Sequence, residues 1–530
     1  MPTITIDGQQ IEAQDGQMVL QAALDAGIDI PHYCYHPGLS IVASCRICLA
    51  EVEGVPKLLP TCQTAVRDGM VVRTRSPRSI ANQKHVMEFL LVNHPLDCPV
   101  CDQSGECFLQ DYSYEYGRAV SRLEDDKHKK PKKIVGERVL LYNDRCIMCT
   151  RCVRFTREVS GESELMVQGR GHKEEIDIFP GKPLDNQLSL NVVDLCPVGA
   201  LLDRDFLFKQ RVWLLKSARS VSPVDAGGEN INLQFNEGVI YRIKPRYNPD
   251  VNQWWISDDT RYSYKAVHSP DRLRSGAVRE MGMLDQADFD VAADAAIDGL
   301  RRAAEEGGAG SIFAVLSPMM ACEEAWLLGR LIREIDSQAT LVLGPVPDAG
   351  EDEVFRHYDT KEETFRIQGE KVPNRRGIER VMTMLGGPTA SWSDFTRGTG
   401  AFRGGWIVGG YLSDWTGGEF PAAFRGAFTV VQDILPNEIV RNADVVLPAA
   451  AWAEKDGCWE NWQNRIQPFE AAIDAPPGIE LEGALYARLL GSTEGYDVAS
   501  IRQEMGGDFA DVIFAQADDE AESPFEFAAL

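Results

Sequence analysis

The sequence lacks long apolar runs and a surplus of basic residues, and its last two-thirds contain almost no cysteine. No hydrophobic stretch approaches the roughly 20 residues that a helix needs to cross a bilayer. Lysine and arginine number 54 against 80 aspartates and glutamates. The resulting net charge of −26 disfavours nucleic acid or an anionic membrane surface as the main partner. Residues 1–13 carry neither a secretory apolar core nor an arginine-rich presequence, which favours a bacterial-type cytoplasmic protein.

The cysteines are concentrated in the first third of the chain. Eleven of the thirteen fall within the first 196 residues, and only Cys322 and Cys458 lie beyond. Clustered cysteines in a reducing compartment are more often metal ligands than disulfides. With 530 residues the chain has room for about three or four domains. We therefore expect a row of metal centres supported by the remainder of the protein.

The segment HPLDCPVCDQSGEC, residues 94–107, is the densest of these candidate sites. Its one imidazole and three thiols could hold a single tetrahedral metal ion or one cubane cluster. Apolar spacing predicts a helix over residues 79–94 that Pro95 ends, which places the histidine facing the cysteine loop. We favour a [4Fe–4S] cluster over zinc. The predicted ligands are His94, Cys98, Cys101 and Cys107.

A first set of four cysteines precedes this segment with the spacing C-x10-C-x2-C-x13-C. Patterning predicts strands at 3–7, 48–52 and 70–74 and a helix at 18–26, which together make a small α+β domain. The pattern resembles plant-type [2Fe–2S] ferredoxins, although the first interval is longer than in that class. A structural zinc is the alternative. The predicted ligands are Cys34, Cys45, Cys48 and Cys62.

A third set begins with the tight triplet C-x2-C-x2-C and ends in a Cys-Pro pair after 43 intervening residues. Bacterial ferredoxins combine the same triplet with a distant Cys-Pro ligand around a [4Fe–4S] cluster. The intervening residues indicate a loop and hairpin insertion, and the charged run 125–133 before the triplet indicates a solvated loop at a domain boundary. The predicted ligands are Cys146, Cys149, Cys152 and Cys196.

These three ligand sets, in this order and spacing, resemble the large iron–sulfur subunit of respiratory NADH:quinone oxidoreductase, complex I. The resemblance implies one [2Fe–2S] and two [4Fe–4S] clusters that pass electrons from a flavin subunit toward quinone. It also implies partners in the peripheral arm: the flavin/NADH-binding subunit, the small [2Fe–2S] subunit and the quinone-side iron–sulfur subunits. The implied location is the cytoplasmic face of the bacterial inner membrane, without membrane insertion.

Some members of this family carry a further cluster on C-x2-C-x3-C-x27-C. Here the same spacing holds oxygen side chains in place of thiols. Oxygen donors are poor ligands for an iron–sulfur cluster, so we predict an empty fourth site, with calcium or magnesium as the alternative. Trp254 and Trp255 are expected to anchor this module. The four positions are Ser222, Asp225, Glu229 and Ser257.

From about residue 272 onward, alternating helix and strand patterns predict a mostly parallel α/β sheet covered on both faces. Residues 443–467 resemble the molybdopterin-dependent oxidoreductases. The domain is much shorter than those enzymes need, and neither late cysteine has a pterin-binding context, so no molybdopterin is expected. GGWIVGG, residues 404–410, does not fit a dinucleotide fingerprint, and its glycines are predicted to form tight turns.

The predicted architecture is thus multidomain, α+β followed by α/β. It comprises a β-grasp [2Fe–2S] ferredoxin-like domain (1–78), a one-His/three-Cys [4Fe–4S] module (79–125) and a bacterial-ferredoxin-like [4Fe–4S] domain (136–212). A degenerate fourth-cluster module (215–271) and a shortened molybdopterin-oxidoreductase-like domain (272–530) complete it. The acidic segment 517–527 is expected to be flexible or to contact a partner.

The leading functional prediction is an electron-transfer subunit of complex I with no substrate-converting residue of its own. Hydride chemistry on NADH would belong to a partner, because no fitting dinucleotide fingerprint is present. The alternatives are a catalytic or electron-relay subunit of an NAD-linked formate dehydrogenase or hydrogenase, or a structural protein with zinc in its thiol sets.

Overall fold

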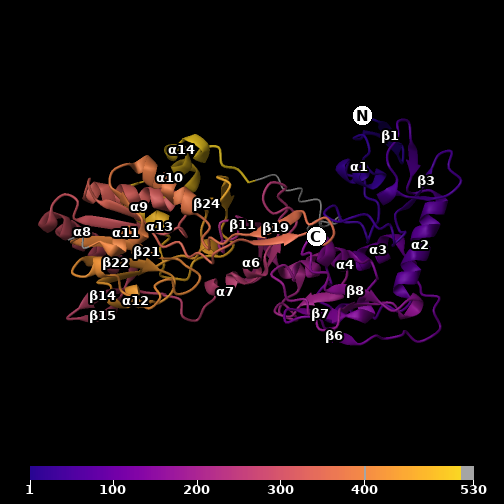
Figure 1. Cartoon of the computed structure of the whole chain (residues 1–530), viewed down its shortest axis with the longest axis horizontal. Coiled ribbons are helices and arrows are strands. Elements are labelled where there is room, and N and C mark those ends of the chain that lie inside the picture. Colours follow the sequence, from indigo (N-terminus) through magenta and orange to yellow (C-terminus); the bar gives the residue numbers. More distant parts are fainter. Residues whose placement is uncertain (399–401, 494, 515–530) are drawn as a thin grey trace. The chain divides into compact units, whose positions relative to one another are not determined.

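The computed structural model describes residues 1–398, 402–493 and 495–514 (Figure 1). The acidic segment 517–527 lies outside the described residues. The chain forms two compact units. Among the described residues the first unit contains 1–215 and 354–365, and the second contains 216–353 and the described residues from 366 onward. No helix in the described ranges is long and apolar enough to span a bilayer.

The first unit opens with the small α+β sheet that the sequence predicts. Its strands are β1 (Thr3–Ile6), β2 (Gln9–Glu12), β3 (Leu49–Val52), β4 (Leu59–Pro60) and β5 (Val71–Arg73), in the order β2-β1-β5-β3-β4. Helix α1 (Val19–Asp25) buries Val19, Leu20, Ala22 and Ala23, and Gly27 follows it at φ 69°. The long loop between α1 and β3 contains three of the four cysteines of the first set.

Helix α2 (Pro77–Leu91) begins at the capping residue Ser76, whose side chain accepts from the amide of Ser79. The predicted helix over 79–94 is wrong at its far end, because the helix stops at Leu91. There Lys127 Nζ donates to the Leu91 carbonyl oxygen at 2.7 Å, which satisfies one of the terminal helix acceptors. His94 therefore lies in the loop that joins α2 to α3 (Phe108–Tyr116).

A three-stranded sheet, β10-β7-β6, supports the third cysteine set. Its strands are β6 (Lys132–Ile134), β7 (Val139–Tyr142) and β10 (Leu201–Asp203). Helix α4 (Arg151–Glu158) and the short α5 (Asn191–Leu195) pack beside it. The expected hairpin insertion is confirmed as β8 (Leu165–Gln168) paired with β9 (Glu175–Ile178).

The first unit also takes in a hairpin tip from much later in the chain. Strands β18 (Glu353–Arg356) and β19 (Glu363–Ile367) form a hairpin whose residues 354–365 belong to this unit. Thr364 Oγ1 donates to the Val159 carbonyl oxygen at 2.6 Å, and the Tyr358 amide donates to the Arg157 carbonyl oxygen at 2.8 Å. A Cβ on Gly161 would lie 1.8 Å from the Arg356 carbonyl oxygen, so only glycine fits this close approach. The tip therefore covers the end of α4.

The second unit begins with the antiparallel sheet β11 (Lys216–Val221), β12 (Asn230–Asn236) and β13 (Val239–Pro245), followed by α6 (Asp258–Tyr262) and α7 (Tyr264–Val267). Trp255 is buried as expected, and Trp254 stacks on Tyr247 with ring centroids 4.6 Å apart. The hairpin β24 (Gly457–Glu460) and β25 (Ile466–Phe469) shares a core with this sheet through Trp459 and Phe469.

An eight-stranded sheet forms the body of the second unit, in the order β15-β14-β23-β22-β21-β16-β17-β20. Six neighbouring strands are parallel, and the β14–β15 hairpin adds an antiparallel edge, so the expected mostly parallel sheet is confirmed. The strands are β14 (Gly276–Glu280), β15 (Met283–Ala287), β16 (Ile312–Leu316), β17 (Thr340–Leu343), β20 (Thr389–Ala390), β21 (Gly404–Val408), β22 (Phe428–Asp433) and β23 (Val445–Pro448).

Helices cover both faces of this sheet (Figure 1). Ile312, Ala314 and Leu316 share one core with α8 (Phe289–Gly307), α9 (Cys322–Ile335), α10 (Arg375–Leu385) and α13 (Glu482–Leu489). Phe313 and Val315 face the opposite core with α11 (Trp392–Arg397) and α12 (Glu438–Asn442). Helix α14 (Val498–Met505) joins the first of these cores through Met505. Alternate side chains of β16 thus point into two hydrophobic cores, one on each face of the sheet.

The prediction of tight turns in GGWIVGG is wrong for its first two glycines. Gly404 and Gly405 lie inside β21. A Cβ on Gly405 would lie 2.1 Å from the Phe313 ring, so the glycine makes room for an aromatic side chain on the neighbouring strand. Beyond the strand, Gly410 has φ 90° and its amide donates to Asp433 Oδ1 at 2.8 Å.

Candidate metal centres

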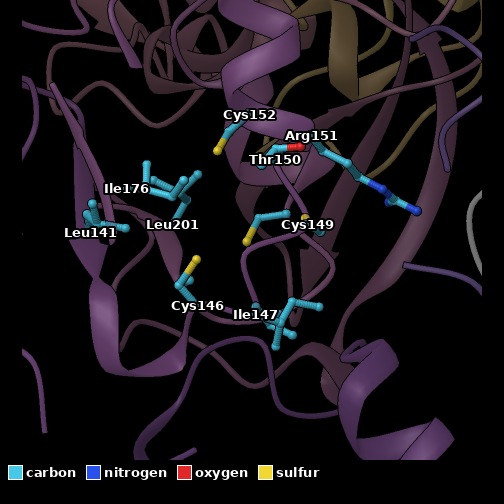
Figure 2. Close-up of a pocket in the computed structure, with 12 residues that line it drawn as sticks. Leu141, Cys146, Ile147, Cys149, Thr150, Arg151, Cys152, Ile176 and Leu201 are labelled. Carbon is cyan, nitrogen blue, oxygen red and sulfur yellow. The ribbon is translucent and has the colours of Figure 1, made fainter. Parts of the chain in front are cut away.

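Four cysteines from two separate segments of the chain line a single cavity. Cys146 and Cys149 lie in the loop before α4, Cys152 lies in its first turn, and Cys196 follows α5. Figure 2 shows the sulfurs of Cys146, Cys149 and Cys152 facing the same space, while the Arg151 side chain extends away from it. The apolar part of the wall comprises Leu141, Ile147, Ile176, Val198, Ala200 and Leu201.

Two left-handed residues shape the loop that carries the triplet. Met148 has φ 55° and Thr150 has φ 61°. The Met148 amide donates to Cys146 Sγ at 3.4 Å. Amide donors of this kind stabilise negative charge on a ligand sulfur and so tune a bound cluster.

Burial favours the protonated form of the thiols in this cavity when no metal is bound to them. Burial raises the pKa of Cys146 to about 12 and that of Cys196 to about 11, because the thiolate is poorly solvated there. Four mutually close thiolates would repel one another, and a positively charged group that binds them removes this repulsion and releases their protons. The donor set and the apolar wall therefore fit an iron–sulfur cubane.

The first cysteine set is also assembled by the fold. Cys48 Sγ and Cys62 Sγ lie 3.6 Å apart, and Cys34 is hydrogen-bonded to Cys45. The hydrogen bond with Cys45 lowers the pKa of Cys34, and the hydrogen bond with Cys62 lowers the pKa of Cys48. The same two hydrogen bonds raise the pKa values of Cys45 and Cys62, so each pair shares one proton. Thiols with lowered pKa values supply the thiolate form that binds metal. The set therefore fits a two-iron cluster.

In the second set, Cys101 and Cys107 are buried and Cys98 is exposed. Burial lowers the pKa of His94 to about 4, so its imidazole is neutral at pH 7. Its Nδ1 is buried and has no hydrogen-bond partner among the described residues. A buried, unpartnered imidazole nitrogen requires an explanation, and ligation of a metal centre supplies one.

The second and third sets touch through Gly199, three residues after Cys196. A Cβ at this position would lie 2.2 Å from Cys101 Sγ, so the sulfur occupies the space that any larger residue would fill. The buried Arg145 donates to Asp97 Oδ2 at 3.0 Å and to the Gly199 carbonyl oxygen at 3.4 Å. The amide of Phe108 donates to the Pro197 carbonyl oxygen at 3.1 Å.

The four oxygen-bearing positions of the fourth set come together in the second unit. Glu229 accepts from the Ser257 amide at 3.0 Å and from Ser257 Oγ at 3.3 Å. Thr260 Oγ1 lies 2.6 Å from Ser222 Oγ and 3.0 Å from Ser257 Oγ. Asp225 Oδ1 accepts from the Gly227 amide at 2.7 Å. Burial raises the pKa of Glu229 to about 8 and that of Asp225 to about 6.

The two late cysteines lie in the core of the second unit. Cys322 begins α9 and Cys458 lies in β24, and both are fully buried among apolar residues. Burial and the neighbouring Cys322 raise the pKa of Cys458 well above its ordinary value. Across the described part of the chain, no three His, Cys, Asp or Glu side chains converge as ligands around a single ion would.

Models of known protein families match five stretches of the chain. They are a 2Fe-2S iron-sulfur cluster binding domain (1–77) and an NADH-ubiquinone oxidoreductase-G iron-sulfur binding region (83–122). An NADH-quinone oxidoreductase subunit 3 ferredoxin-like domain follows (136–202), then an NDSU1/NuoG-like 4Fe-4S domain (215–265) and a molybdopterin oxidoreductase model (423–478). The expected [2Fe–2S] and [4Fe–4S] domain types are thereby confirmed.

Curated relatives match more than half of the chain. An NADH-quinone oxidoreductase subunit of Rickettsia bellii, the one designated G, is 38% identical over 335 residues, covering 63% of this chain and 48% of the relative. The mitochondrial 78 kDa subunit of NADH-ubiquinone oxidoreductase from Neurospora crassa is 44% identical over 291 residues, covering 54% of this chain and 39% of the relative. The chain is a homologue of the large iron–sulfur subunit of NADH:quinone oxidoreductase.

This homologue spans about half the length of the curated relatives it matches. Among solved structures, an NAD+-reducing [NiFe]-hydrogenase in the H2-reduced state covers 40% of this chain and 91% of its own, with 29% identity and a TM-score of 0.36. The NDSU1/NuoG-like 4Fe-4S model includes the fourth set, whose four positions carry hydroxyl and carboxyl groups here.

Proposed function

We propose that the chain is an electron-transfer subunit of a complex I-type NADH:quinone oxidoreductase. It would carry electrons from the flavin subunit toward quinone through one [2Fe–2S] and two [4Fe–4S] clusters. The cavity lined by Cys146, Cys149, Cys152 and Cys196 carries this proposal, because four thiols in an apolar wall, three of them buried, are suited to a cubane. Homology to the Rickettsia bellii subunit and to the 75 kDa and 78 kDa subunits of NADH-ubiquinone oxidoreductase supports it.

The ligand assignment is part of the proposal. The [2Fe–2S] cluster would be held by Cys34, Cys45, Cys48 and Cys62, and one [4Fe–4S] cluster by Cys146, Cys149, Cys152 and Cys196. The second [4Fe–4S] cluster would be held by His94, Cys98, Cys101 and Cys107. Each cluster, when bound, accepts and releases one electron.

The chain's own residues control the surroundings of these clusters. The apolar wall of the four-cysteine cavity excludes water, and amide donors such as that of Met148 stabilise charge on the sulfurs. Arg145 and Lys127 lie near enough to His94 to lower its pKa further, which keeps the imidazole neutral. A neutral ligand removes one negative charge from that site and favours the reduced state.

The fourth set is proposed to hold no cluster. Hydrogen bonds join Glu229 to Ser257, and Thr260 links Ser257 to Ser222. These bonds occupy the oxygens that a metal would need. Carboxylate and hydroxyl groups are also poor iron–sulfur ligands. This hydrogen-bonded closure would replace the cross-link that a cluster provides, and β11, β12, β13 and α6 would form a metal-independent module.

The α/β domain is proposed to be a scaffold without molybdopterin. Partners would be the flavin/NADH-binding subunit, the small [2Fe–2S] subunit and the quinone-side iron–sulfur subunits, in a peripheral arm on the cytoplasmic face of the bacterial inner membrane. The five proposed domains keep the boundaries 1–78, 79–125, 136–212, 215–271 and 272–530, and the first would be a β-grasp ferredoxin-like domain.

The deciding experiment measures iron and acid-labile sulfide per chain, together with EPR of the anaerobic, dithionite-reduced protein. The proposal predicts about ten irons, two from one cluster and four from each of the others, with one two-iron and two four-iron signals. About fourteen irons would show a filled fourth site, and zinc in place of iron would end the electron-transfer assignment. Molybdenum in the same sample would favour a formate-dehydrogenase type of enzyme instead.

A further inference from the structure

One face of α4 docks against the loop that carries the first cysteine set. Arg151, Arg154 and Glu158 are spaced three and four residues apart, so their side chains lie along the same side of the helix. Arg151 donates to the Tyr35 carbonyl oxygen, and Arg154 donates to the carbonyl oxygens of Cys34 and Ser40. The helix that presents Cys152 to one centre therefore holds the loop that presents Cys34 to another.

Both arginines are buried, with exposed fractions of 6% for Arg151 and 8% for Arg154. Their hydrogen-bond acceptors are neutral carbonyl oxygens, and within the described part of the chain neither guanidinium has a salt-bridge partner. Each Nε is also buried without a partner among those residues. A buried cation with only neutral partners costs several kcal/mol, so a nearby anion is needed to offset that cost.

Cluster ligands act on these cations electrostatically. Burial lowers the pKa of Arg151, and the thiolate of Cys149, followed by Tyr112 and Cys34, acts in the opposite direction. The positive charges of Arg151 and Arg154 likewise counter the rise that burial imposes on the pKa of Cys149. His36 lies beside them and has a pKa well below its ordinary value because of burial and the two arginines, so it is neutral. Burial and Arg151 likewise lower the pKa of His32 to about 4.

We infer that Arg151 and Arg154 are the shared counter-ions of the centres held by the Cys34 set and the Cys146 set, and that their charge raises the reduction potential of both. The inference rests on the proposed function, because it needs both centres to be clusters. A cluster gains one negative charge on reduction, and a cation fixed nearby in a poorly solvated interior stabilises that added charge. The carbonyl bonds serve to hold the guanidinium groups in place between the two ligand segments.

The test is an EPR-monitored redox titration of the full chain loaded anaerobically with iron and sulfide. Arg151→Gln and Arg154→Gln should each lower the equilibrium constant for one-electron reduction of both centres at least tenfold, a shift of about 59 mV. The matched control is Arg157→Gln on the same helix, since Arg157 is exposed and pairs with Asp359 at 2.9 Å. In this control the equilibrium constants for one-electron reduction of both centres should stay within about threefold of the parent's.

The one-His centre provides an internal comparison. The cations that act on His94 are Arg145 and Lys127, so the Arg151 and Arg154 variants should shift the potential of this centre less than those of the other two. Fully loaded glutamine variants whose potentials match those of the Arg157 control would overturn the inference. A shift confined to the one-His centre would overturn it as well.

Lysine variants separate the effect of charge from that of geometry. They also keep the inference testable if the glutamine variants fail to bind clusters. Arg151→Lys and Arg154→Lys keep the charge and lose the planar fork. Parent-like potentials in the loaded lysine variants support the inference. A tenfold fall despite the retained charge, or failure of the lysine variants to load, would show that carbonyl bonding matters and the charge does not. An unvaried chain that binds no iron would instead end the proposed function.

Discussion

Gly199→Ala tests the contact between the second and third ligand sets. The added Cβ would lie 2.2 Å from Cys101 Sγ and 3.1 Å from Gln103 Cβ. Ordinary contacts between such atoms are about 3.5–4.0 Å, so the sulfur must move by about 1.3 Å or more. Ligand positions in metal centres tolerate only about 0.2 Å. The Cys101 backbone cannot follow easily, because Arg211 donates to its carbonyl oxygen at 2.9 Å.

The expected result is therefore a selective loss of the one-His centre. Iron should fall by about four per chain, and one of the two four-iron EPR signals should disappear while the two-iron signal remains. The matched control is Gly181→Ala, where no atom lies within 4 Å of the added Cβ and only the left-handed φ of 81° is strained, at a cost of about 1–2 kcal/mol. That variant should keep all its iron. A Gly199→Ala protein with about ten irons and both four-iron signals would refute the packing argument.

Three other changes give distinct outcomes. His94→Cys should retain the four-iron signal but lower the reduction potential of that centre, because a thiolate adds one negative charge to the site. An unchanged signal with an unchanged potential would show that His94 is not a ligand. Glu229→Gln should flatten the pH dependence of stability. The carboxyl pKa rises on folding from 4.5 to about 8, so the folded state holds a proton there and the parent loses stability as the pH rises from about 5 to 8. The test is urea unfolding at several pH values. Unfolding free energies that change equally with pH in variant and parent across that range would contradict this. Arg272→Met leaves Glu454 buried without its partner, whose two hydrogen bonds measure 3.1 and 3.0 Å. Urea unfolding of the second unit should show a loss of about 3–5 kcal/mol with unchanged iron, and a loss below about 1 kcal/mol would contradict the buried pairing.

The iron–sulfur domain types were predictable because much of the cysteine spacing is local information. The triplet around Cys149 and the loop around Cys45 need only a few residues to define them. The parallel sheet was also predictable, since strands such as Phe428–Asp433 alternate with helical patterns along the sequence. The order of strands and the β14–β15 edge were not, because pairing depends on residues far apart in the chain.

The residues that the sequence reasoning missed act at long range. Gly199 must be glycine because of Cys101, and Gly405 must be glycine because of Phe313. Neither contact can be recognised from the residues next to these glycines in the sequence. Arg151 and Arg154 can be recognised in the sequence, because they are spaced three residues apart, one inside the thiol triplet and one directly after it. Their burial and carbonyl partners could only come from the fold.

The hairpin tip formed by residues 354–365 has a consequence for how the protein is made. The cluster-binding unit is complete only when this tip covers Gly161 and the end of α4. At a synthesis rate of about 5–20 residues per second, the tip leaves the ribosome roughly 8–30 s after residue 215. During that interval the end of the helix that bears Cys152 is without its cover, so the cluster-binding unit stays incomplete until synthesis has passed residue 365.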